Sequence, residues 1–161
     1  MTFRGALVLF AFGVAASASA QTKISGTVQC KSEPVTPVEI GDKPGHAFAI
    51  IKNACTWTTP MEIAGAHTKT GDDVIAVEMN GSSSSDHGYH LDVMDDGDKF
   101  TVRFSGSGKS KDGKPVGSAG TWSFVSGTGK VKGIQGKGTY KGTANADGTT
   151  TVQIAGEYSI H

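Results

Sequence analysis

The sequence has no formal net charge, and beyond its first 20 residues it lacks long apolar segments. It contains 15 Lys and Arg against 15 Asp and Glu. A nucleic-acid-binding domain usually presents a basic surface that neutralises phosphates, so this balance argues against a nucleic-acid partner. Beyond residue 20 no apolar run approaches the length of a transmembrane helix. We therefore expect neither nucleic-acid binding nor a membrane span.

The one apolar run, residues 5–16, is too short to span a bilayer and has the flanks of a secretory signal peptide. Arg4 precedes it, and an A-x-A pattern ending at Ala20 follows it. We expect cleavage after Ala20 and a secreted or periplasmic protein. Residues 21–161 would then form one domain, since 141 residues match a single hydrophobic core.

Cysteine is scarce, with only Cys30 and Cys55 in the chain. An even count in an exported protein predicts a disulfide. No C-x-x-C motif is present for redox chemistry or for a zinc ribbon, and the spacing does not show the adjacent base that a cysteine nucleophile needs. We predict that a Cys30–Cys55 disulfide joins the first strand to the next segment.

Convincing helical periodicity is absent, whereas glycine is abundant. The 23 glycines and the period-two alternation of apolar residues predict strands almost throughout. A proline-bearing loop is expected at 33–44, and a flexible polar segment at 81–85. Strands are expected at 23–31, 46–54, 57–69, 73–80, 89–94, 99–104, the segment ending at 121–124, and a last strand after 146–149.

Turn signals recur at regular intervals in the second half of the chain. Turn glycines stand at Gly97, Gly113, Gly129 and Gly148, and aspartate precedes three of them. Asp-Gly between alternating segments indicates a β-hairpin, because glycine adopts the positive φ of the primed turns. About eight sequential antiparallel strands predict an up-and-down β-barrel, which leaves no exposed edge. A two-sheet β-sandwich is the alternative.

Three glycine-rich motifs carry a family resemblance. They are Gly120–Phe124 (GTWSF), Gly127–Lys130 (GTGK) and Gly136–Gly142 (GKGTYKG). This segment resembles the late strand and turn of the allene oxide cyclase and dirigent barrels, and more closely small uncharacterised secreted bacterial proteins. The resemblance implies an eight-stranded antiparallel barrel, often oligomeric, with a central cavity. No catalytic residue of those families matches a position here.

Charged residues inside strands are the candidates for catalysis. Arg103, Glu78 and Glu157 alternate with apolar residues or stand in the middle of strands. If the aromatic face of each strand points into the barrel, these residues lie in solvent. If it points outward, they line the lumen, where burial would raise a carboxyl pKa and favour acid or base catalysis.

Aromatic residues and a histidine cluster are the candidates for binding. Four aromatic residues could stack on a ligand or fill the core: Trp57, Trp122, Tyr89 and Tyr140. The segment Asp86–His90 holds two histidines, and Asp92 follows on the same face of a strand as His90. His87 and His90 would need a bulge at Gly88 to share a metal, so we expect no metal site and, with no cofactor motif present, no cofactor.

Three hypotheses for function remain open from the sequence. The first is a barrel that binds a small apolar or amphipathic ligand in its lumen. The second is an isomerase or cyclase that uses the cavity and one or two polar residues. The third is a structural or interaction module, a homo-oligomer with a solid core and no cavity.

Overall fold

The computed structural model describes residues 21–161, so the predicted signal peptide lies outside the described residues. The fold is all-β and confirms the barrel prediction. Eight long antiparallel strands form the wall: β1 (Thr22–Ser32), β3 (His46–Thr59), β5 (Ala66–Asn80), β6 (Ser83–Met94), β7 (Lys99–Lys111), β8 (Lys114–Gly127), β9 (Ile134–Ala144) and β10 (Thr149–Ile160). The short elements are β2 (Val38–Glu39), β4 (Glu62–Ile63) and the 3-10 turn η1 (Gly129–Val131).

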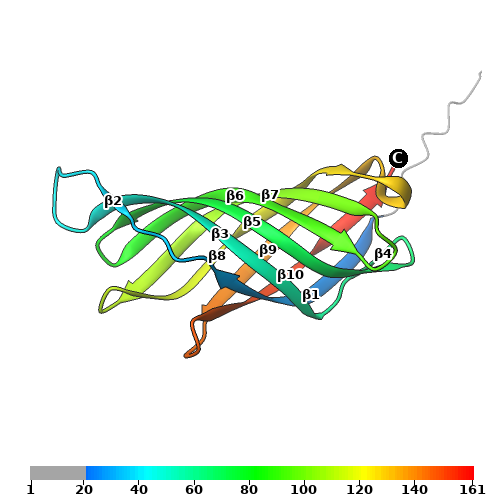
Figure 1. Cartoon of the computed structure of the whole chain (residues 1–161). Coiled ribbons are helices and arrows are strands. Elements are labelled where there is room, and N and C mark those ends of the chain that lie inside the picture. The colour runs from blue at the N-terminus through cyan, green and yellow to red at the C-terminus, as the bar shows by residue number, and fades with distance from the viewer. Residues whose placement is uncertain (1–20) are drawn as a thin grey trace, which may run out of the picture.

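The sheet closes on itself through β1. Each long strand pairs with its neighbours in the chain, and β1 pairs with both β3 and β10. Figure 1 shows the strands running obliquely around an elongated barrel. Closure satisfies the edges that two separate sheets would leave exposed, and the sandwich alternative is not formed. In the part of the chain that the structure describes, no helix is long and apolar enough to cross a membrane.

The two ends of the barrel differ. The tight turns β5–β6, β7–β8 and β9–β10, which contain Gly81, Gly113 and Gly148, form the hairpin end. The other end carries β4, η1 and the C-terminus, and we call it the terminal end (Figure 1). Gly129 does not make a simple hairpin turn as expected, because it starts η1 within a longer connection.

Strand boundaries in the first half differ from the prediction. β3 continues to Thr59, and the chain then turns through Pro60 to Gly65 before β5 begins. Proline cannot donate to a sheet ladder, and Ala64 and Gly65 have positive φ values of 53° and 79°, so the break falls here. The serine segment expected to be flexible is largely strand, since Ser83, Ser84 and Ser85 pair with β5 and β7.

The terminal end of the lumen is packed with side chains. Buried apolar residues from several strands and from the β3–β5 and β8–β9 connections meet there: Ile24, Trp57, Met61, Ile63, Met94, Phe100, Val131 and Ile134. Burial of each large apolar side chain stabilises the fold by about 1.5–3 kcal/mol. This half of the barrel is therefore its hydrophobic core.

Inward-facing glycines make room for large aromatic side chains. Trp122 on β8 lies over Gly138 of β9 and Gly156 of β10, and a Cβ on either glycine would collide with its indole ring. Tyr140 on β9 lies in the same way over Gly120 and Gly106. These glycines therefore supply the space inside the barrel that the two aromatic side chains occupy.

Candidate functional site

A cavity of about 300 Å³ occupies the lumen between the packed core and the hairpin end. Its lining reaches exposed residues of the hairpin end, Lys109 and Pro115, so it meets solvent there. Much of the wall is apolar, with side chains from β3, β5, β7, β8 and β10: Ile51, Ile75, Val77, Met79, Val102, Phe104, Phe124, Val152 and Ile154. The lumen is therefore neither solid nor uniformly polar.

The strand β6 faces the lumen with its polar side chains. His90 is 9% exposed and Asp92 0%, whereas Tyr89 and Leu91 on the opposite face are 56% and 41% exposed. This inverts the usual arrangement, in which apolar residues point inward and polar residues face water. Burying polar groups costs free energy unless they are paired, so their position calls for a network of partners.

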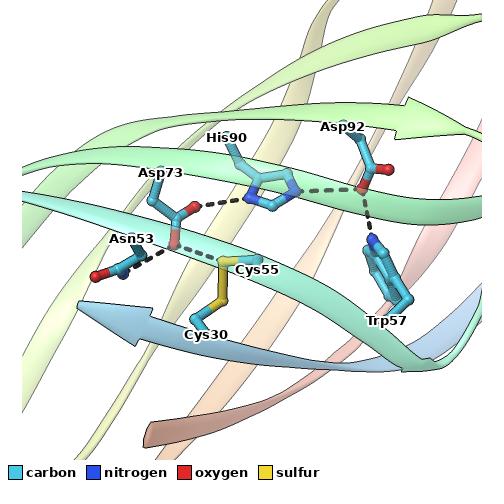
Figure 2. The surroundings of a disulfide bond; sticks show 7 residues. All are labelled: Cys30, Asn53, Cys55, Trp57, Asp73, His90 and Asp92. Atoms are coloured by element: carbon cyan, nitrogen blue, oxygen red, sulfur yellow. Dashed lines mark hydrogen bonds and ion pairs between the residues drawn. A yellow bond between two sulfur atoms is a disulfide. The ribbon is translucent and has the colours of Figure 1, made fainter. Parts of the chain in front are cut away.

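His90 lies between two carboxylates. Its Nδ1 is 2.7 Å from Oδ1 of Asp73 on β5, and its Nε2 is 3.2 Å from Oδ2 of Asp92 (Figure 2). The indole Nε1 of Trp57 donates to the same Oδ2 of Asp92 at 2.7 Å. Both ring nitrogens of His90 therefore face an acceptor, an arrangement that the doubly protonated imidazolium satisfies.

Protonation of His90 follows from this geometry. Burial lowers the pKa of the imidazole, but the hydrogen bonds to Asp73 and Asp92 outweigh it and raise the pKa to about 9. Burial also raises the pKa of the Asp92 carboxyl, against the opposing effect of His90 and Trp57. At neutral pH the network therefore holds a buried cation between two acids.

The disulfide borders this network. Cys30 and Cys55 are bonded across β1 and β3, as predicted, and Sγ of Cys55 lies 3.4 Å from Oδ2 of Asp73 (Figure 2). A disulfide sulfur has no proton to donate, so this is a close contact and not a hydrogen bond. Among the described residues, the two sulfurs and Asp73 form a tight group of metal-ligand types, but bonded sulfurs offer no thiolate.

A second polar pair lies closer to the hairpin end. The hydroxyl of Tyr140 donates to Oδ2 of Asp86 at 2.6 Å, although the two residues stand on β9 and β6. The phenol reaches across because Gly120 and Gly106 lie between them in one register row. Burial and the neighbouring Asp86 carboxylate raise the pKa of Tyr140, so the hydroxyl keeps its proton.

Gly106→Ala is expected to lower the free energy of unfolding by about 1–3 kcal/mol, because its methyl group would collide with the Tyr140 hydroxyl and overpack the wall. Denaturant unfolding measures the change. Ser107→Ala, at the neighbouring exposed position, is the control. Equal stability of the two variants would show that Tyr140 does not depend on the space at Gly106.

Several residues singled out from the sequence lie outside the barrel. Arg103, Glu157, His87 and Tyr89 border an open depression of about 1000 Å³ on the outer surface of β6–β10. Arg103 is exposed and its Nε donates to Ser123. On β7 the aromatic face therefore points into the barrel, with Phe100, Val102 and Phe104 turned inward, and Arg103 lies on the solvent face.

Glu78 also lies on the outer face, 2.9 Å from Nε2 of His46. The lumenal interpretation of Arg103, Glu78 and Glu157 therefore does not match their placement. No bulge turns His87 inward, since β6 pairs regularly with β5 and β7 through Gly88. His87 and His90 consequently point to opposite faces of the sheet.

The lumen does contain four of the predicted residues: Trp57, Trp122, Tyr140 and His90. Sequence reasoning missed the roles of Asp73 and Asp86. The signal for Asp92 was present, because it shares a strand face with His90. Nothing in the local sequence shows that Asp73 would face the same histidine, since the contact depends on the pairing of β5 with β6.

Comparisons with known proteins support the fold alone. No protein-family model matches the chain, and no curated protein matches it. A crystal structure of a conserved protein of unknown function from Rhodopseudomonas palustris aligns with a TM-score of 0.54 at 13% identity, covering 88% of this chain and 99% of that one. A protein of unknown function from the DUF3224 family of Shewanella oneidensis aligns with a TM-score of 0.48 at 16% identity, covering 85% and 96%. The chain is thus similar in fold to a barrel protein of unknown function, and the resemblance to allene oxide cyclase and dirigent barrels stays a prediction.

Proposed function

We propose that this barrel binds a small, mainly apolar ligand in its lumen. The observation that carries the proposal is the cavity of about 300 Å³, which is enclosed by the strands and meets solvent at the hairpin end. Ligand pockets of proteins begin at about this size and combine apolar walls with a few placed polar groups. The wall here has that composition.

The polar network supports the same proposal. A barrel selected only for stability would fill this space with apolar side chains, because replacing buried ion pairs by well-packed apolar residues is often neutral or stabilising. Instead β6 turns His90 and Asp92 inward and leaves Tyr89 and Leu91 in solvent. Departures of this kind from local pattern rules tend to mark functional positions.

Export is part of the proposal. The disulfide between Cys30 and Cys55 is of a kind that persists in oxidising compartments, and the sequence predicts a signal peptide that ends at Ala20. A secreted or periplasmic site of action would suit a carrier or scavenger of small molecules. Mass spectrometry of the mature protein would test cleavage after Ala20.

An isomerase or cyclase of the allene oxide cyclase type is supported less well. Both nitrogens of His90 already face carboxylates, and the hydroxyl of Tyr140 already donates to Asp86. A proton-transfer role would require one of these contacts to open. The three charged residues that the sequence suggested for catalysis are on the outer surface.

Ser118→Trp is expected to abolish ligand binding by filling the cavity. Ser118 faces the lumen between Gly108 and Gly142, so an indole ring has room to lie across the neighbouring strands, as Trp122 does. Titration of an uncharged probe, 1-octanol, by calorimetry measures binding. Ala119→Trp is the matched control, because residue 119 is exposed on the outer face.

Saturable binding to wild type and to Ala119→Trp, with loss of at least tenfold in Ser118→Trp, would support the proposal. Absence of saturable binding by any probe to folded wild-type protein would contradict it. Binding that survives in Ser118→Trp would place the ligand elsewhere on the molecule.

The predicted homo-oligomer stays a prediction. Exposed apolar side chains gather on the outer faces of β3, β5 and β6, among them Phe48, Ile50, Val74, Tyr89 and Leu91. Large exposed apolar patches often mark association surfaces. The mass of the folded protein in solution, measured by light scattering, tests whether this chain self-associates.

A further inference from the structure

Acids outnumber cations on the wall of the cavity. Three aspartates line it: Asp73, Asp86 and Asp92. His90 is the cation among them, and it is shared between two of the three acids. Lys109 is the other cation of the lining, but it is an exposed rim residue whose Nζ donates to Ser83 at 3.1 Å. Asp86 therefore carries a charge that no described cation pairs with.

The fully buried hydrogen-bonding groups of the wall also leave acceptors, and no donors, unpaired. Its buried donors are in use, because Trp57 donates to Asp92, Tyr140 to Asp86, and the amide of Asn53 to Asp73 at 3.0 Å. Among the fully buried side-chain atoms of the described residues, the two without a hydrogen-bond partner are both acceptors, Oδ1 of Asn53 and Oδ1 of Asp92. Figure 2 shows that Oδ1 of Asp92 points away from His90 and Trp57. The acid of this wall that is both half-buried and without a cationic partner among the described residues is Asp86, and a ligand with N–H donors would pair with it.

Aromatic rings surround the same space. Phe104 packs edge-on against Tyr140 with centroids 5.8 Å apart, and Trp122 packs in the same way against Phe124 at 5.2 Å. All four residues line the cavity. Aromatic faces attract cations and also accept apolar chains, so they suit a ligand with both parts.

We propose that the lumen selects an amphipathic cation: an ammonium-type head group, rich in N–H donors, on a short apolar chain. The inference rests on the proposed function and narrows it to a ligand class. The head group pairs with Asp86, which lies nearer the hairpin end of β6 than His90 and Asp92 do, while the chain contacts apolar side chains such as Val77 and Val152. A neutral ligand would leave the Asp86 carboxylate without a cationic partner, and an anion would be repelled by the three acids.

Three probes with the same eight-carbon chain separate the ligand class from ligand binding itself. They are octylammonium, 1-octanol and octanoate, titrated calorimetrically at pH 7 below the micelle concentrations of the two ions and below the solubility limit of the alcohol. We expect octylammonium to bind at least about tenfold more tightly than octanol, since a charge-assisted hydrogen bond commonly contributes that much. Octanoate is expected to bind most weakly.

The variant Asp86→Asn tests whether the Asp86 carboxylate binds the ammonium head group. The amide oxygen still accepts from Tyr140, so the variant removes charge with little change of shape, and octylammonium affinity should fall about tenfold while octanol affinity stays unchanged. Asp72→Asn is the matched control, because Asp72 is exposed on the outer face of β5 and the net charge changes equally. Should Asp86→Asn fail to fold, judged by its melting curve, the three-probe comparison on wild type and on Ser118→Trp decides alone.

The outcomes distinguish the two proposals. Octanol that binds as tightly as octylammonium, or octanoate that binds more tightly, would overturn the cation inference and leave lumenal binding intact. Equal losses in Asp86→Asn and Asp72→Asn would show a general charge effect and overturn the inference as well. No saturable binding of any probe would contradict both proposals.

Discussion

Replacing His90 with leucine is expected to lower the free energy of unfolding by about 3–5 kcal/mol at pH 7, because removing one partner leaves the other charges buried without compensation. Asp73 and Asp92 would then face each other's charge without the imidazolium that lies 2.7 Å and 3.2 Å from them. Denaturant unfolding followed by tryptophan fluorescence measures the change. The control is His87→Leu, on the solvent face of the same strand, which should change stability by about 0.5 kcal/mol or less.

The effect of His90 is expected to depend on pH with a definite sign. Its folded pKa of about 9 lies above the ordinary value of 6.5, so its contribution is full below pH 6.5 and is lost as the pH rises through 9. The pKa of His46 is also raised, by hydrogen bonds to Glu78 and Asp42, so the quantity to compare is the difference between wild type and His90→Leu. A difference that grows between pH 6.5 and 9, or one no larger than that of His87→Leu, would contradict the buried ion pair.

Removing the disulfide is expected to lower stability by roughly 3–4 kcal/mol in the chain-entropy account, since the bond closes a loop with a sequence separation of 25. The double variant Cys30→Ala/Cys55→Ala and reduced wild type should show the same loss in denaturant unfolding, because both release the same loop. The Cys30→Ser variant should in addition expose the Cys55 thiol to thiol reagents on unfolding. A Cys55 thiol that already reacts in unreduced, unfolded wild-type protein would refute the bond.

The fold was predictable because it depends on local signals. Alternating apolar residues indicate strands, Asp-Gly pairs indicate hairpins, and eight sequential strands favour a closed barrel. The predicted strand boundaries were wrong where a strand ends at an irregular turn. One example is Ala64, whose positive φ completes the connection between β3 and β5. The serines 83–85 look flexible in sequence, but a turn of two residues leaves them free to pair with β5 and β7.

The candidate site was predictable only in part. The alternation in β6 shows that His90 and Asp92 share one face and Tyr89 and Leu91 the other, and apolarity alone would turn the second pair inward. The pairing of β6 with β5 instead sets Gly71 opposite Asp92 and Asp73 opposite His90. Gly71 has no side chain to fill this space, and a Cβ there would collide with the imidazole. The polar face therefore fits inside.

The sequence by itself therefore determined the all-β class, the disulfide partners and the two faces of each strand, because these follow from period, turn chemistry and cysteine count. It favoured a closed barrel, but only the structure excluded the β-sandwich. Only the tertiary structure decided which face is lumen. A period of two defines two faces without ranking them, and in β6 the outcome depends on residues of other strands. Register across the closed sheet brings Asp73, His90 and Asp92 together, and Gly106 and Gly120 let Tyr140 reach Asp86. These contacts join residues that are far apart in the sequence, and this is the physical reason that the grouping of the three aspartates around the cavity could not be predicted from the sequence.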